Sequence, residues 1–86
     1  MGNDTSLRES LADQAHESWS RWMAHLFQNS ESQPDGSVMI PSELVSRWRR
    51  QIATEYSGLT DSEKDSDRRE ADRILRILNQ RQETAR

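Results

Sequence analysis

The chain has 86 residues and a mass of 10.0 kDa, contains no cysteine and carries a formal net charge of −3. The length allows one small domain, and the lack of thiols excludes disulfides, zinc–cysteine sites and a cysteine nucleophile. The longest uninterrupted apolar run, residues 38–40, is too short for a membrane span or for the core of a signal peptide. We therefore expect a small intracellular domain that makes no membrane contact.

A long helix is predicted over residues 6–28. Ser6 and Glu9 have the spacing of a capping box, in which a hydroxyl and a carboxylate each accept a hydrogen bond from a free amide of the first turn. Residues 1–5 are therefore expected to be a disordered start. Apolar side chains follow at helical spacing: Leu7, Leu11, Ala15, Trp19, Trp22, Met23, Leu26 and Phe27.

A polar loop should separate this helix from a second one over residues 41–55. Residues 34–36 read Pro-Asp-Gly, which is typical of a tight turn. Residues 38–40 form a short apolar link, and an extended conformation is expected before Pro41 because a proline disfavours helical angles in the residue that precedes it. Pro41 itself suits the first position of a helix, where no N–H is required.

A third helix is predicted over residues 61–79. Thr60 and Glu63 have capping-box spacing, and residues 81–86 should form a frayed tail. The predicted fold class is all-α: a single compact three-helix domain, residues 6–80, with a long first helix and a loop containing the Pro-Asp-Gly turn. The three segments should collapse onto a centre rich in tryptophan.

The inner face of the third helix changes character along its length. Its apolar side chains lie in the second half, and the same spacing projected backward reaches Asp67 and Lys64. Ionic groups that face a core require matched partners. We therefore expect Asp67 to pair with Arg50 or with His16.

The residues that would support catalysis are missing from the sequence. A zinc-protease helix would need a second histidine four residues after His16, where the chain has Ser20. His25 is nine residues from His16 and lies on the opposite side of a helix. There is no Gly-x-Ser-x-Gly turn and no glycine-rich phosphate loop. We predict that the protein is not an enzyme and requires no metal or cofactor.

Aromatic and basic side chains suggest where a partner would bind. A core this small is not expected to cover every tryptophan, and a partly exposed indole is a natural anchor for another protein. A homodimer is compatible with this spare tryptophan surface. The arginines around Trp48 could also contact nucleic acid, although the acidic balance of the chain argues against this. The predicted partner-binding residues are Arg21, Trp22, His25, Arg47 and Arg49.

A small-ligand pocket is the alternative site. His16 lies three residues before Trp19, a spacing that brings side chains together on a helix. His16 could be a hydrogen-bonded interior histidine, or it could line a polar pocket with residues of the third helix. The pocket set is His16, Trp19, Tyr56, Lys64, Asp67 and Arg68.

The segment from residue 54 to residue 72 resembles a family of small, uncharacterised phage and prophage proteins. The shared pattern is Tyr56-x-x-Leu59 followed by Glu63-Lys64-x-Ser66-Asp67-Arg68-x-Glu70-Ala71-Asp72. The segments His16-Glu17-Ser18-Trp19 and Arg47-Trp48 match the same family, so the resemblance covers most of the chain. It implies a phage or prophage accessory protein in the cytoplasm of a bacterial host, which acts by binding a host or phage macromolecule.

A weaker similarity connects the chain to the RyR domain, the repeat of ryanodine receptors. That domain also has a His-Glu-x-Trp helix and a Tyr-x-x-Leu segment before its last helix, but this chain lacks its Gly-Trp-x-Tyr-Gly turn. This similarity implies the alternative function, the binding of a nucleotide or metabolite in the pocket set. Nucleic-acid binding through the arginine-rich second helix is the third interpretation.

Overall fold

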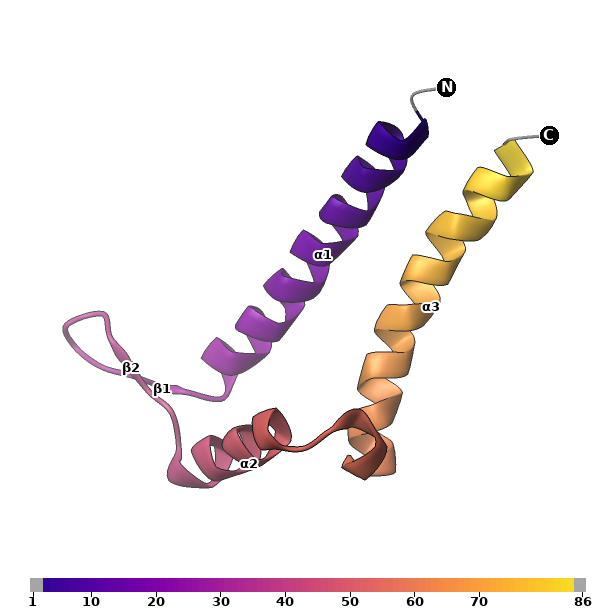
Figure 1. Cartoon of the computed structure of the whole chain (residues 1–86). Helices are drawn as coiled ribbons and strands as arrows, with labels where there is room; N and C mark the ends of the chain where they lie inside the picture. Colours follow the sequence, from indigo (N-terminus) through magenta and orange to yellow (C-terminus); the bar gives the residue numbers. More distant parts are fainter. Residues whose placement is uncertain (1–2, 85–86) are drawn as a thin grey trace.

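The computed structural model describes the backbone of residues 3–84 and the side chains of residues 5–80 (Figure 1). It is mostly helical, and the predicted all-α architecture with three helices and a long first helix is confirmed. The elements in chain order are α1 (Asn3–Gln28), β1 (Glu31–Ser32), β2 (Val38–Met39), α2 (Ser42–Ala53), the 3₁₀ turn η1 (Tyr56–Gly58) and α3 (Asp61–Thr84).

The ends of the long helices differ from the prediction. Helix α1 begins at Asn3, so Ser6 lies inside the helix and does not start it. Residues 3–5, expected to be disordered, form the first turn of α1, and residues 1–2 lie outside the described part. Helix α3 continues to Thr84, so the tail expected to fray from residue 81 is helical as far as the structure describes it.

The start of α3 has the predicted capping box. The backbone N–H of Thr60 donates to Glu63 Oε1 over 3.0 Å, and the N–H of Glu63 donates to Thr60 Oγ1 over 3.2 Å. Two amides that the helix leaves without a carbonyl partner are thereby satisfied. This box places the Glu63 side chain at the end of α3 nearest α2.

A short hairpin replaces the expected loop and link. Strands β1 and β2 pair antiparallel, with Glu31 opposite Met39. The connecting turn depends on Asp35, whose carboxylate accepts the hydroxyl of Ser37 over 2.6 Å and its N–H over 3.0 Å. Both hydrogen bonds lower the pKa of Asp35, and the one from the Ser37 hydroxyl has the larger effect. Gly36 has a φ of 91°, which favours glycine because it has no Cβ.

Helices α1 and α3 run antiparallel beside each other, and α2 crosses between them at one end (Figure 1). Only Gln14 and Ser18 are buried among the side chains of residues 5–80, with 8% and 7% of their surface exposed, and no hydrophobic side chain in that range is buried. Trp19 and Trp22 remain 57% and 51% exposed. The expected tryptophan-rich centre is therefore wrong, and the centre of the α1–α3 contact is polar.

The rotation of α3 about its own axis explains this difference. The more sheltered positions of α3 are Glu63, Lys64, Ser66, Glu70, Arg73 and Ile77, and apart from Lys64 they alternate steps of three and four residues. Such steps mark one face of a helix packed along another helix. The apolar stripe that was expected to point inward is instead on a neighbouring face of α3, where it is exposed.

The molecule is consequently more open than the compact domain that the sequence predicts. Its radius of gyration is 17.2 Å, and its principal dimensions are 53 × 34 × 16 Å. A compact domain of this length would have a radius of gyration of about 12 Å. The three helices surround an open space instead of filling it.

Candidate binding cleft

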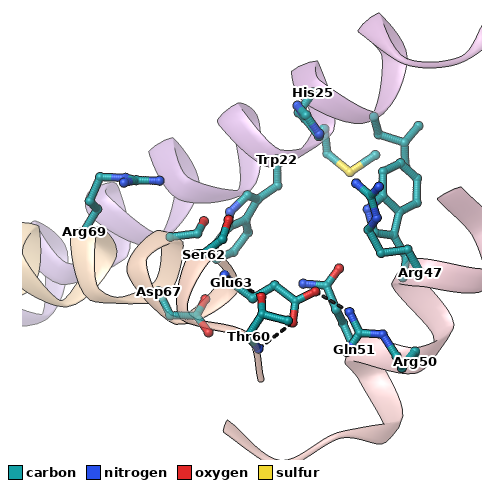
Figure 2. Close-up of a pocket in the computed structure, with 14 residues that line it drawn as sticks. Trp22, His25, Arg47, Arg50, Gln51, Thr60, Ser62, Glu63, Asp67 and Arg69 are labelled. Carbon is teal, nitrogen blue, oxygen red and sulfur yellow. Dashed lines mark hydrogen bonds and ion pairs between the residues drawn. The ribbon is translucent and has the colours of Figure 1, made fainter. Parts of the chain in front are cut away.

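An open cleft of about 860 Å³ lies between the C-terminal half of α1, helix α2 and the first turns of α3 (Figure 2). Helix α1 contributes Trp22 and His25, and α2 contributes Arg47 and Trp48. Trp22 and His25 are three residues apart, about one turn, and therefore lie on the same face of α1, whereas Arg47 and Trp48 are consecutive residues of α2 that both reach the cleft. Helix α3 adds hydroxyl and charged groups, including Asp67 and Arg69.

An ion pair closes one side of the cleft. Arg50 Nη2 donates a hydrogen bond to Glu63 Oε2 and so ties α2 to the start of α3. The hydrogen bond from Arg50 has the largest effect on the pKa of Glu63, and together with the hydrogen bond from the N–H of Thr60 it lowers this pKa. The predicted pairing of Asp67 with Arg50 or His16 is wrong, because the carboxylate that reaches Arg50 belongs to Glu63, one turn earlier on α3. Asp67 is exposed and lines the cleft.

A ring contact joins α1 to α2 across the cleft. The imidazole of His25 and the indole of Trp48 have centroids 6.4 Å apart and planes tilted by 59°. Trp22, on the same face of α1 as His25, stays half exposed. Neither Arg47 nor Arg69 has an ion-pair partner among the side chains that the structure describes. The cleft thus offers an indole surface together with two guanidinium groups that form no ion pair with the carboxylates of residues 5–80.

The predicted partner-binding residues fall into two groups. Trp22, His25 and Arg47 line the cleft together (Figure 2). Arg21 is on a different side of α1, where its Nη2 donates to Glu70 Oε1 over 2.5 Å and to Oε2 over 2.8 Å. Arg49 is exposed on α2 and does not line the cleft.

The pocket residues of the alternative are not gathered around the cleft. His16 stacks on Trp19 along α1, with ring centroids 6.0 Å apart and planes 23° from parallel. At the start of α3, Lys64 Nζ lies 5.7 Å from the centroid of the Tyr56 ring. The pKa of Arg68 is raised, mainly by its hydrogen bond to Asp65 and to a smaller extent by the neighbouring Tyr56. Of the six residues only Asp67 lines the cleft.

A polar cluster centred on Glu70, which the sequence analysis does not single out, joins α1 to α3. The Ser18 hydroxyl donates to Glu70 Oε1, and Arg73 Nη1 donates to Oε2 over 2.9 Å. Partial burial raises the pKa of Glu70, but the hydrogen bonds from Ser18 and Arg21 and the charges of Arg21 and Arg73 outweigh this effect, so the pKa is lowered overall. In the amino-acid sequence, the feature that could have indicated this cluster is a pair of polar residues three positions apart on each helix: Ser18 with Arg21 on α1, and Glu70 with Arg73 on α3.

The structure also bears on membranes and metals. Within residues 3–84, no helix combines the length and the apolar character that crossing a bilayer requires. Among the described side chains, no three histidine or acidic groups come close enough together to hold a metal ion.

Comparison with known proteins adds no relative to this description. No protein-family model matches the chain, and no curated protein or solved structure matches it significantly.

Proposed function

We propose that the protein is a non-enzymatic binding module that holds a segment of another protein in the cleft between α1, α2 and α3. The observation that carries the proposal is the half-exposed indole of Trp22 together with the guanidinium groups of Arg47 and Arg69, which form no ion pair with the carboxylates of residues 5–80. Tryptophan and arginine are the side chains most enriched at the energetic centres of protein interfaces.

The chemistry of the cleft defines the segment that would fit. Trp22 and Trp48 offer flat apolar surface to an aromatic or aliphatic side chain. Arg47 and Arg69 offer planar donors that match a carboxylate. A short acidic segment with an adjacent aromatic residue satisfies both. The origin implied by the resemblance makes this partner a host or phage protein.

Nucleic acid fits the same cleft less well. Glu63 and Asp67 line it together with the arginines, and the whole chain carries a net charge of −3. A phosphate backbone carries a negative charge on every nucleotide and would bring several of them against these carboxylates, whereas a short peptide can present a single carboxylate to Arg47 or Arg69. Extended binding to phosphates depends on positive charge.

The test is selection from a library of short peptides, followed by affinity measurements on the selected sequences. Peptides that combine Asp or Glu with an aromatic residue should be enriched. Trp22→Ala and Arg47→Glu should each weaken their binding at least 10-fold, an effect expected of residues at the centre of an interface.

The chain provides a matched control for each variant. Phe27 is as exposed as Trp22, at 55% against 51%, but lies outside the cleft lining, and Arg49 is two residues from Arg47 on α2 and also lies outside it. Phe27→Ala and Arg49→Glu should leave the affinity for peptide within about twofold. Equal losses in all four variants would refute the cleft as the site. Binding of DNA or RNA with a steep salt dependence, in place of peptide, would favour the nucleic-acid interpretation instead.

A further inference from the structure

One face of the α1–α3 pair is apolar and uncovered. Ile74 and Leu78 on α3 are 41% and 37% exposed, Trp19 on α1 is 57% exposed, and Ala71 on α3 is exposed as well. We call the surface formed by these four side chains the hairpin face. None of them lines the cleft.

Helix geometry places the four side chains on the same side of the pair. On α1, Ser18 points at α3, and on α3, Glu70 points at α1, because the two side chains are hydrogen bonded. Successive residues advance by about 100° around a helix. In two antiparallel helices, the residues that follow such contact positions therefore project to a common side. Trp19 directly follows Ser18, and Leu78 directly follows the sheltered Ile77.

The opposite side of the pair is charged. Beside the contacts at Gln14, Ser18, Glu70, Arg73 and Ile77, the residues that directly precede the contact positions project there by the same geometry, and all five are ionic: Asp13, Glu17, Arg69, Asp72 and Arg76. The positions that follow these five contacts hold Ala15, Trp19, Ala71, Ile74 and Leu78, whereas nearer the cleft Lys64 and Asp67 follow Glu63 and Ser66. The helical hairpin is thus amphipathic as a unit. Such a unit requires an apolar layer against its uncovered side.

The exposed area indicates the size of that layer. The chain exposes 7130 Å², whereas a compact monomer of the same mass exposes about 5,200 Å². The difference, about 1,900 Å² per chain, is shared between the open cleft and the hairpin face, and it is comparable with the roughly 1,000–2,500 Å² that each subunit of an obligate homodimer buries. The side chains of residues 5–80 also include no buried hydrophobic residue, so the single chain lacks the apolar burial that drives folding.

A second copy of the chain meets these requirements. Its own hairpin face has the same length and the same apolar character, and a twofold axis brings two such faces together. The ionic residues on the opposite side then point away from the junction, which keeps the like charges of two chains of net charge −3 apart. We infer that two chains pair through their hairpin faces into an antiparallel four-helix bundle, with Trp19, Ala71, Ile74 and Leu78 of both copies in its core.

The oligomeric state tests this inference directly. Sedimentation equilibrium of the full chain at micromolar concentration should give twice the 10.0 kDa chain mass. Ile74→Glu places a carboxylate in the hairpin face and should weaken dimerisation at least 100-fold. Arg76→Glu, two residues later on the charged side, is the matched control and should remain dimeric.

Thermal melting of the unchanged chain keeps the test decisive if Ile74→Glu fails to fold. The melting temperature of a homodimer rises with protein concentration, because association stabilises the folded state. A monomeric mass together with a melting temperature that does not change over a 100-fold range of concentration would overturn the inference. A folded and dimeric Ile74→Glu, or a monomeric Arg76→Glu, would show that a different surface pairs.

Discussion

Removal of the Glu70 carboxylate tests whether polar contacts hold α1 against α3. The Glu70 side chain is 15% exposed and accepts hydrogen bonds from Ser18, Arg21 and Arg73. The bond from the buried Ser18 hydroxyl to a carboxylate contributes about 1.5–2 kcal/mol. The Arg21 and Arg73 side chains are 41% and 35% exposed, so solvent screening reduces each ion pair to about 0.5 kcal/mol. Glu70→Ala should therefore lower the free energy of unfolding by about 2.5–3 kcal/mol.

Thermal unfolding followed by circular dichroism at a fixed protein concentration measures this loss. In a domain of this size, 1 kcal/mol corresponds to about 4–8 °C in Tm, so the Tm of Glu70→Ala should fall by roughly 10–20 °C. Asp72→Ala is the matched control, because Asp72 is exposed two residues later on α3 and both variants acquire the helix propensity of alanine. Its Tm should change by less than about 4 °C.

A double-mutant cycle isolates the contact that carries most of the effect. Ser18→Ala and Glu70→Ala should show a coupling energy of at least about 1 kcal/mol, since the two side chains share a hydrogen bond. Equal melting temperatures for Glu70→Ala and Asp72→Ala, or additive effects in the cycle, would refute the role of this cluster.

Two further predictions concern the capping box and acid. Thr60→Ala should destabilise the protein by about 1 kcal/mol, because the N–H of Glu63 loses its hydroxyl acceptor. Chemical denaturation measures this loss, and Ser57→Ala, at an exposed serine in η1, is the control. An unchanged denaturation midpoint for Thr60→Ala would contradict the prediction. The lowered pKa values of Glu63 and Glu70 mean that their stabilisation is complete above the ordinary glutamate pKa, about 4.3, and is lost as pH falls through the lowered values. Melting curves from pH 7 to pH 3 should therefore show a Tm that declines below about pH 4.3, and a Tm that rises there would have the wrong sign.

Signals within one turn of the chain predict the start of α3 but not that of α1, where Ser6 and Glu9 both lie inside the helix. The capping box of Thr60 and Glu63 forms as expected because both partners lie within four residues of each other. The helical segments follow from their apolar spacing for the same reason. The hairpin was missed because each strand has only two residues, too few for the alternating pattern that identifies a strand.

The rotation of α3 is not predictable from one sequence by the same reasoning. An apolar stripe indicates which face of a helix is covered, but not whether the cover belongs to the same chain. The expectation that Ile74 and Leu75 point at α1 therefore placed Asp67 on the inner face, whereas the structure places Glu70 there and leaves Ile74 and Leu75 exposed. The contact between Glu63 and Arg50 was missed for the same reason, because it depends on this rotation.

The antiparallel course of α1 and α3 gives the molecule two unlike ends. Helix α1 begins and α3 finishes at one end of a body 53 Å long, while the cleft lies toward the other end, beside α2 (Figure 1). A reporter protein or affinity tag fused beyond either helix would therefore project away from the cleft. Immobilised in this orientation, the chain would present Trp22 and Arg47 to a passing ligand without obstruction from its support.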